Sequence, residues 1–430
     1  MADDILTTPE IDSILQCYEI TKLEDIGKRR WFSKNANIVK LYQIASLEAS
    51  LECTERVKES VLRTGTTNYF IKDLITLSVW KEYVLPELTK LKPVPKHCLP
   101  TYIVLYNEVA LIGILQSLLY HIEVFVYTDE ILTDLIDYCV NKLTTLNPDS
   151  VPIISEIKLD ETALEEIERY HNQIKFTVSA NCITVLRYIC ENLSQLPMNV
   201  ASRIYATHDV PILIAQLLDI GVWSKRAQDG KLFKFCENKW KEWFVKDPPL
   251  SKIEVQTWLL IRQLLLNPSC DTLYYFSQYR KEHLSKLLRH LHENVIDQLS
   301  PLADLKYWLH TNSLKADDDG PRVHNPLIVD VSCQYKDVVF AEYNGRWKDI
   351  ALARAKLLFY GDQKDMQFLA TGFSSCMDNI EKLTDTLQSC MNCHAKANKR
   401  CSKCKQASYC SRNCQVEHWP AHKNIMNVKH

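Results

Sequence analysis

The sequence predicts a mainly α-helical protein, in which a helical body precedes a small zinc-binding finger at the C-terminal end. Apolar residues recur at helical spacing through most of the chain. Only nine glycines and few alternating runs argue against a large sheet. Six of the 16 cysteines gather between residues 390 and 414. With 46% hydrophobic residues, the 430-residue chain can bury a large core and form about two to four domains.

The chain divides into four predicted parts. Residues 1–311 form the helical body, residues 312–326 a linker, residues 327–389 a further helical segment, and residues 390–430 the finger. The linker contains an acidic run, a glycine and two prolines, a composition that interrupts helices. Within the further segment, residues 341–359 and 364–389 are expected to be helices that lead into the finger.

The first helices of the body are predicted from their apolar spacing. Residues 128–146 carry apolar side chains at helical intervals, with Thr128 as the expected cap. Residues 101–126 are apolar on most faces, which predicts a helix at the centre of a helical stack. Asn107, Glu108 and Glu123 interrupt this run, so we expect no membrane span. The N-terminal residues do not resemble a signal peptide, and we expect a soluble intracellular protein.

Later helices recur at an interval that suggests a repeat. Residues 185–193 lead to a helix over 209–218, with Asp209 as its cap, Pro211 in its first turn and Gly221 just past its end. Another helix is expected over 255–266. The interval of about 45 residues lies in the armadillo/HEAT range and predicts an α-solenoid. An irregular helical bundle is the alternative.

Residues 221–250 are predicted to be an irregular stretch. It holds Trp223, Trp240, Trp243 and Phe244. Aromatic side chains in a long loop are expected to hold the loop against the core. A binding platform is the alternative interpretation.

The cysteine cluster predicts zinc. It reads Cys390-x2-Cys393, Cys401-x2-Cys404 and Cys410-x3-Cys414, and His418-x3-His422 follows. Paired thiolates two residues apart can both reach one metal ion, and thiolate with imidazole selects zinc among common cytosolic metals. Two such pairs with a Cys/His tail can supply two tetrahedral zinc sites. The remaining ten cysteines are scattered singly and are expected to be reduced core residues.

The order of these residues resembles a MYND-type zinc finger, including Tyr409-Cys410 and the signature from Cys414-Gln415 to His418-Trp419. The resemblance implies interleaved ligands. One zinc would take Cys390, Cys393, Cys410 and Cys414, and the other Cys401, Cys404, His422 and a cysteine at position 426. It also implies a shallow groove for a proline-rich peptide, lined by Gln415 and Trp419. Core packing of the small domain is the alternative role for Trp419.

Position 426 departs from the family pattern because it holds methionine, and a neutral thioether is a poor zinc ligand. His418 or His430 can substitute, or the second site binds weakly. We favour His418, because it lies four residues from His422 and the two can chelate from one helical face. Against this, the resemblance places His418 beside Trp419 as a packing residue.

No catalytic motif accompanies the finger. Nucleotide-binding loops, a nucleophile elbow and a zinc-protease motif are missing from the sequence, so we expect a binding protein without catalysis. MYND fingers also occur in lysine methyltransferases, but those enzymes need a glycine-rich cofactor site. The finger carries eight Lys/Arg and one acidic residue, Glu417. This basic charge offsets its thiolates, and we expect no nucleic-acid partner.

The body has a resemblance of its own, carried by V-W-K-E-Y-V-L-P (79–86), by Tyr106-Asn-Glu108, by V-L-R-Y-I (185–189), by T-H-D-V-P (207–211) and by residues 223–232. The chain is similar to the MYND domain-containing protein ten family. The resemblance implies a cytoplasmic adaptor that assists preassembly of axonemal dynein arms for motile cilia.

The implied partners are a leucine-rich-repeat dynein assembly factor, Hsp90 and Hsp70 chaperones with immunophilin co-chaperones, and dynein chains as clients. The implied location is the cytoplasm, at dynein assembly foci or near the centrosome and ciliary base. The alternative function is a nuclear transcriptional corepressor adaptor that uses its MYND finger. The sequence contains no DNA-binding motif in the body to support it.

Overall fold

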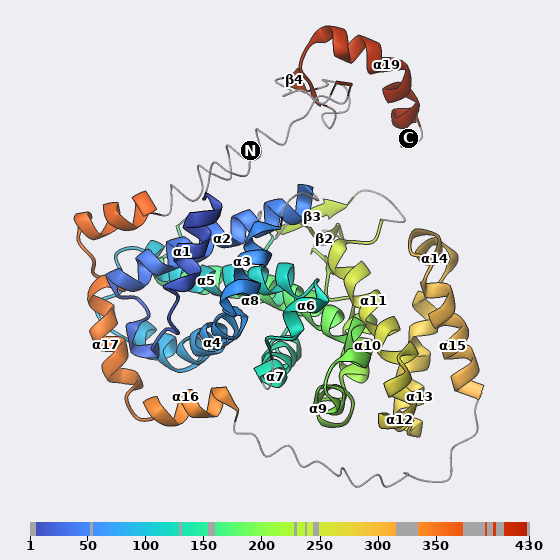
Figure 1. Cartoon of the computed structure of the whole chain (residues 1–430), viewed down its shortest axis with the longest axis horizontal. Coiled ribbons are helices and arrows are strands. Elements are labelled where there is room, and N and C mark those ends of the chain that lie inside the picture. The colour runs from blue at the N-terminus through green and yellow to red at the C-terminus, as the bar shows by residue number, and fades with distance from the viewer. Residues whose placement is uncertain are drawn as a thin grey trace.

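The computed structural model describes residues 6–51, 55–128, 131–153, 160–227, 230–236, 239–243, 249–314, 334–372, 392–393, 399–400 and 408–427. Helices dominate these residues, as predicted (Figure 1). The helices of the body are α1 Thr8–Gln16, α2 Arg29–Leu51, α3 Arg56–Thr64, α4 Thr67–Thr89, α5 Leu99–Leu118, α6 Ile122–Phe125, α7 Ile131–Thr144, α8 Ala163–Glu191, α9 Met198–Ser202, α10 Val210–Ile220, α11 Lys252–Leu266, α12 Pro268–Leu273, α13 Gln278–Ser285, α14 Glu293–Gln298, α15 Leu302–Leu314, α16 Tyr335–Tyr343 and α17 Trp347–Leu358. Tighter or wider helical turns occur at Leu23–Asp25, Pro148–Ser150, Leu193–Gln195, Arg203–Thr207 and Lys286–His290.

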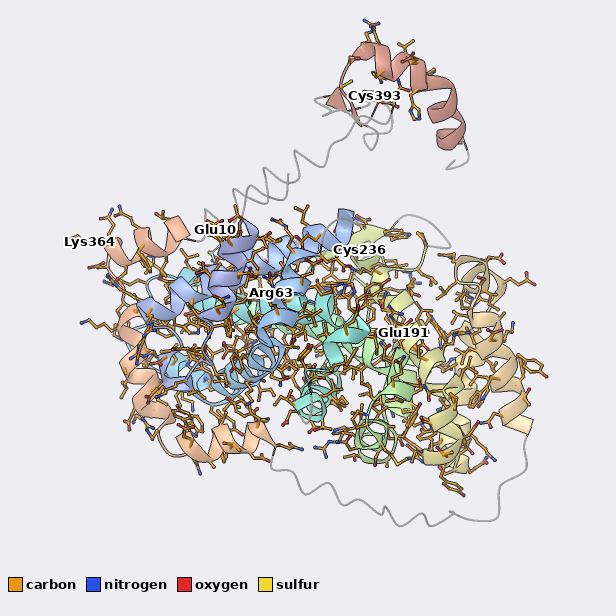
Figure 2. All side chains as sticks on the ribbon, in the orientation of Figure 1. Glu10, Arg63, Glu191, Cys236, Lys364 and Cys393 are labelled. Atoms are coloured by element: carbon orange, nitrogen blue, oxygen red, sulfur yellow. The ribbon has the colours of Figure 1, made fainter. Side chains whose placement is uncertain are left out.

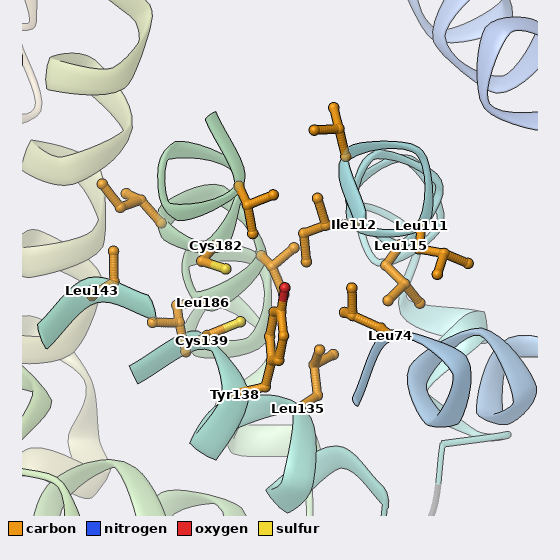
Figure 3. Packing of buried hydrophobic residues seen from close by; sticks show 14 of the residues in the cluster. Leu74, Leu111, Ile112, Leu115, Leu135, Tyr138, Cys139, Leu143, Cys182 and Leu186 are labelled. Atoms are coloured by element: carbon orange, nitrogen blue, oxygen red, sulfur yellow. The ribbon is translucent and has the colours of Figure 1, made fainter. Parts of the chain in front are cut away.

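The core is centred on α5 and α8. Helix α5 packs against α2, α4 and α8, while α8 also packs against α7 and α11. Figure 3 shows side chains from four helices meeting at this centre, among them Leu74 of α4, Ile112 of α5, Tyr138 of α7 and Leu186 of α8. Because α5 is apolar on most of its faces, it can be surrounded by other helices while burying few polar groups.

By length and composition, one helix in the described part of the chain, α5, could cross a membrane. Its most apolar window has a mean hydropathy of 1.3, and 78% of that window is buried inside the protein. The helix predicted over 101–126 divides here, since α5 ends at Leu118 and α6 begins at Ile122. Asn107 and Glu108 are buried within α5 with polar partners, as expected of a helix in a protein core.

Several helix ends follow from local sequence. Thr162 begins α8 with a capping box: its hydroxyl accepts the Glu165 N–H, and the Glu165 carboxylate accepts the Thr162 N–H at 2.8 Å. The predicted stop at Gly221 is confirmed, because this glycine adopts φ 68° after α10. Pro211 lies in the first turn of α10, also as predicted.

The predicted capping bond of Asp209 is wrong. Asp209 precedes α10 but has φ 46° and makes no side-chain bond to the helix. Its carboxylate instead accepts the Tyr274 hydroxyl at 2.5 Å and the Arg280 Nε–H at 2.8 Å. A hydrogen bond from a charged guanidinium is stronger than one from a neutral backbone amide, so Asp209 binds these distant side chains instead of the helix.

The predicted irregular stretch over 221–250 contains a three-stranded antiparallel sheet, so that prediction is wrong in part. The strands are β1 Ser224–Arg226, β2 Leu232–Cys236 and β3 Lys239–Trp243, in the order β1-β2-β3. The predicted packing of this stretch against the core is confirmed for Trp223 and Trp240, because both side chains are buried. Phe235 of β2 lies 4.4 Å, ring centroid to ring centroid, from Phe176 of α8.

The chain returns to its N-terminal helices after α15. Helices α16 and α17 pack against α4, and Figure 1 shows them beside it, far from α15. The Tyr83 ring lies 5.1 Å from Phe340 and 5.0 Å from Trp347. The helix predicted over 341–359 is confirmed for α17 but is not continuous, because Gly345, with φ 81°, separates α16 from α17. Residues 363–372 are helical, and the rest of the helix predicted over 364–389 lies outside the described residues.

The armadillo/HEAT repeat stays a prediction. The segment 185–193 is the end of a 29-residue helix, α8, and a sheet separates α10 from α11. Helix α15 includes the first residues of the predicted linker, and residues 315–326 of that linker lie outside the described part. For Thr128, the hydroxyl donates to the Phe125 carbonyl, and the two residues that follow are not described.

Among the scattered cysteines that the structure describes, Cys139, Cys182, Cys190 and Cys270 are buried free thiols, as predicted. Burial raises the pKa of Cys270 to about 12, which keeps the thiol protonated and unreactive. Cys98 and Cys236 are half-buried, and Cys17 is exposed, so the prediction of a core residue is wrong for Cys17.

Candidate metal centre

A short hairpin and a helix build the finger. Strand β4 (Lys399–Arg400) pairs antiparallel with β5 (Ser408–Tyr409), and α19 (Arg412–Asn427) follows. Cys410 therefore lies directly after β5, and Cys414 lies in the first turn of α19. Ser411 begins this helix, since its hydroxyl accepts the Cys414 N–H at 3.2 Å.

Three cysteine sulfurs converge in the finger (Figure 2 labels Cys393). The Sγ atoms of Cys393 and Cys410 are 3.4 Å apart, those of Cys410 and Cys414 are 3.5 Å apart, and those of Cys414 and Cys393 are 3.7 Å apart. A disulfide would need about 2.05 Å. Four sulfurs at about 2.3 Å from a tetrahedral zinc lie about 3.8 Å from one another. The three thiols thus fit three corners of a zinc site.

The fourth predicted ligand of this site, Cys390, lies outside the described residues, as do Cys401 and Cys404. The side chains of His422, Met426 and His430 also lie outside the described part. The second zinc therefore stays a prediction. In the part of the chain that the structure describes, no other group of three or more metal-capable side chains comes together.

His418 has a partner that the sequence did not indicate. Its Nδ1 lies 3.0 Å from the hydroxyl of Tyr409, and the Tyr409 side chain is buried. This contact joins β5 to α19, and it leaves only Nε2 of His418 to reach a metal. The role of His418 as a zinc ligand stays a prediction, and it would have to use Nε2.

A second contact joins the residue before Cys393 to the helix. The Asn392 side-chain amide donates to the Glu417 carboxylate at 2.8 Å. Asn392 is the neighbour of Cys393, so this bond holds the loop beside the three sulfurs. Nothing in the local spacing signals a bond between residues 25 positions apart. The Ser411 cap, by contrast, had a local signal, because serine directly precedes the helical run.

The predicted partner-binding residues lie on α19. Gln415 and Trp419 are both half-buried and lie four residues apart, so they share one face of the helix. Val416 beside them is 65% exposed. Trp419 is thus neither fully packed nor fully open, and its role in peptide binding stays a prediction.

Comparison with known proteins places the finger in a described family. Residues 390–425 match the MYND finger family. The chain is also 31% identical over 444 residues to the protein named zinc finger MYND domain-containing protein 10 homolog of Drosophila melanogaster. This similarity spans 94% of the chain and 95% of the relative. No solved structure matches the chain. The finger's thiol cluster and this match together support zinc binding.

Proposed function

Because the chain belongs to the zinc finger MYND domain-containing protein 10 family, we propose that it is a non-enzymatic adaptor for the cytoplasmic preassembly of axonemal dynein arms. The observation that carries this proposal is the extent of the match, which includes the helical body as well as the finger. If the function depended on the finger alone, similarity to this family would be needed only over residues 390–425.

The two parts of the chain offer different contacts for such a role. We propose that the helical body presents a long surface to large clients, and that these clients are dynein chains. On α19 the finger carries the half-buried Gln415 and Trp419 and the exposed Val416. We propose that this helix binds a proline-rich segment of a partner, with a leucine-rich-repeat assembly factor as the first candidate. Hsp90 and Hsp70 chaperones and immunophilin co-chaperones are further proposed partners.

The absence of catalysis is also part of the proposal. If Cys390 completes the site of Cys393, Cys410 and Cys414, protein ligands fill all four positions. Such a site has no open position for a catalytic water and serves a structural purpose. Zinc would then stabilise the fold of the finger, and the finger would act by binding.

A rescue experiment in ciliated cells tests the function. In cells lacking the protein, the wild-type chain is expected to restore outer and inner dynein arms, seen by electron microscopy. The variant Cys393→Ser is expected to restore them poorly, whereas Cys17→Ser, which changes an exposed cysteine outside the finger, should restore them fully. Normal arms in the null cells would contradict the proposal.

The location of the tagged chain distinguishes the proposed cytoplasmic adaptor from the alternative, a nuclear corepressor adaptor. A cytoplasmic pool, at assembly foci or near the ciliary base, supports the adaptor. An exclusively nuclear chain with altered transcription would favour the corepressor, whose support here is the basic charge of the finger.

A further inference from the structure

A cavity of about 350 Å³ lies between α4, α7, the start of α16 and His208. Helix α16 contacts both α4 and α7, along the lower edge of the body in Figure 1. Helix α7 forms the longest wall, because its lining residues run from Asp134 to Thr144, about 15 Å along the helix axis. Ligand sites in proteins begin at about 300 Å³, so this cavity can hold a small ligand or one long side chain.

The wall of the cavity has an aliphatic part and an acidic part. Ile75 of α4 and Val140 of α7 are buried side chains that supply the aliphatic part. Asp134 and Asp137 of α7 are half-buried and supply two carboxylates. A ligand that matches this lining has an aliphatic stem and a polar head that is attracted to a carboxylate.

The carboxylate of Asp137 already has partners inside the protein. Arg203 donates to Oδ1 with its Nε at 2.8 Å and to Oδ2 with its Nη2, and Nε2 of His208 also bonds Oδ1. Arg203 begins a π-helical turn, Arg203–Thr207, a rare geometry that is often found at functional sites. Asp137 therefore holds this turn against the cavity and is not the group that awaits a ligand.

Asp134 has no such cation. Its Oδ1 accepts the backbone N–H of Tyr335 at 2.8 Å, which ties the start of α16 to α7. Among the residues that the structure describes, no side chain donates to Asp134 and none forms an ion pair with it. Burial raises the pKa of Asp134, the Tyr335 N–H lowers it, and the charge of Asp137 raises it again. A cation placed against Asp134 would therefore be bound favourably.

The ammonium group that lines the cavity is directed to another partner. Lys336 pairs with Glu82 of α4 at 2.8 Å. The exposed Asp337, in the first turn of α16, adds a further negative charge that acts on Asp134. Asp134 is therefore a carboxylate with acidic neighbours and with no counter-ion among the described side chains.

The buried cations beside the cavity are held by a different carboxylate. Tyr138 lines the cavity, and its hydroxyl donates to Oε1 of the buried Glu108 of α5 at 2.6 Å. Lys142 of α7 pairs with the same oxygen at 2.7 Å, and Lys81 of α4 bonds Oε2. Burial first, and then the charge of Lys81, lower the pKa of His171 in α8 to about 3, so this ring is neutral at physiological pH. This cluster around Glu108 therefore supplies no counter-ion to the cavity.

The donor set of the cavity does not suit a metal ion. Both oxygens of Asp137 are engaged by Arg203 and His208, and no three metal-capable side chains converge here in the described part of the chain. Hard cations such as Ca²⁺ take about six to eight oxygen ligands. An organic cation needs only one carboxylate for its head and an apolar wall for its stem, and the cavity offers both.

We propose that this cavity binds an alkylguanidinium, the chemical group of an arginine side chain. The guanidinium donates to Oδ2 of Asp134, and its aliphatic stem lies along Ile75 and Val140. Guanidinium is favoured over ammonium because it is more weakly hydrated and loses less on entering a half-buried site. The site belongs to the helical body, so it depends neither on the finger nor on the function proposed above.

Two matched pairs of probes test the binding to the full-length protein by saturation-transfer NMR. Butylguanidinium and the neutral butylurea represent a free small molecule. The peptide acetyl-Gly-Arg-Gly-amide and its analogue with citrulline, a neutral isostere of arginine, represent a side chain of a bound protein. We expect each charged probe that binds to do so at least about tenfold more tightly than its neutral partner, because hydrogen bonds to charged groups are the stronger ones.

The two pairs also distinguish the source of the ligand. Binding of butylguanidinium alone assigns the cavity to a free small cation, whereas binding of the arginine peptide assigns it to a protein side chain. Equal affinities of the charged and neutral partners would overturn the proposal. So would the failure of both charged probes to bind at millimolar concentrations.

A variant tests the carboxylate. Asp134→Asn removes the charge and keeps an oxygen that can accept the Tyr335 N–H, so α16 should stay in place. The charged probe that binds the wild type is expected to lose about tenfold or more in affinity. Asp297→Asn, at an exposed position in α14, is the matched control and should change nothing. An unchanged affinity in Asp134→Asn would contradict the site. Circular dichroism checks folding, and the charged and neutral probes on the wild-type chain test the proposal even if the variant does not fold.

Discussion

The hydroxyl of Tyr409 and the Nδ1 of His418 lie 3.0 Å apart and join the finger's hairpin to its helix. Tyr409 directly precedes Cys410, and His418 lies one turn beyond Cys414. The bond therefore fixes the two elements that carry these cysteines relative to each other. In so small a domain, a part-buried hydrogen bond of this kind helps to set the distance between metal ligands.

Tyr409→Phe removes this bond and keeps the buried ring. We expect the finger to lose about 1 kcal/mol, a typical value for one hydrogen bond, and zinc release to a chelator to speed up about fivefold. A zinc-sensitive dye measures the release from the full chain. Tyr279→Phe changes an exposed tyrosine in α13 and should have no effect. Equal release rates for all three proteins would contradict the structural role of Tyr409.

Metal content gives a second prediction. The three converging thiols and the MYND finger match predict one firm zinc and one less certain zinc, so elemental analysis should give between one and two per chain. Cys393→Ser is expected to unfold the finger and spare the helical body, because metal binding supplies the folding free energy of such a domain. Cys17→Ser is the matched control. A zinc content near zero in fresh, reduced protein would contradict the finger.

The ligand missing at position 426 gives a third prediction. Met426→Cys supplies the thiolate of the family pattern and should slow zinc loss from the weaker site. His418→Ala should speed that loss if the Nε2 of His418 is a ligand. Chelator titrations of both variants against the wild type measure this. If neither variant differs from the wild type, the second site depends on His430 or water, or is absent.

Glu108 gives a prediction about the body. Glu108→Gln leaves two buried ammonium groups without their carboxylate and should destabilise the chain by about 3–5 kcal/mol. Glu82→Gln breaks the exposed pair of Glu82 with Lys336, which is worth at most about 1 kcal/mol. Thermal unfolding followed by circular dichroism compares them. Equal melting temperatures for the two variants would show that the cluster adds nothing to stability.

His171 predicts how stability depends on pH. Its pKa is about 6.5 in an unfolded chain and about 3 in the fold. Between these values the unfolded chain binds more protons, so the free energy of unfolding falls as the pH falls from 6.5 toward 3. By pH 5 this loss is about 2 kcal/mol. His171→Gln should flatten this part of the melting profile, and His292→Gln, at an exposed position, should not.

Most helices could be predicted because their signal is local. The apolar face of residues 132–143 is buried in α7 as its spacing indicated, and Gly221 ends α10 because glycine readily adopts a left-handed conformation. The small sheet gave no such signal. In β2 the alternation covers only Phe233, Lys234 and Phe235, shorter than the roughly four to eight residues that mark a strand, and all three side chains are buried. Lys234 is buried because it pairs with Glu254 at 3.0 Å.

The cysteine spacing predicted three thiols that the structure brings together. It could not predict what holds them, because Tyr409 with His418 and Asn392 with Glu417 are contacts between separate elements. The cluster around Glu108 was equally invisible: Lys81, Glu108 and Lys142 lie on three helices, and each alone looks like an interruption of an apolar face. Contacts of this kind depend on how the helices pack.

The return of α16 and α17 to α4 has a consequence for how the chain is made. Glu82 and Lys336 pair across 254 residues of sequence. At about 5–20 residues per second, a ribosome needs about 13–50 s to synthesise the intervening chain. During that time Tyr83 has neither Phe340 nor Trp347 to cover it. A truncated chain that ends before residue 334 would lack α16 and α17, so the Tyr83 face of α4 would stay uncovered for as long as that chain exists.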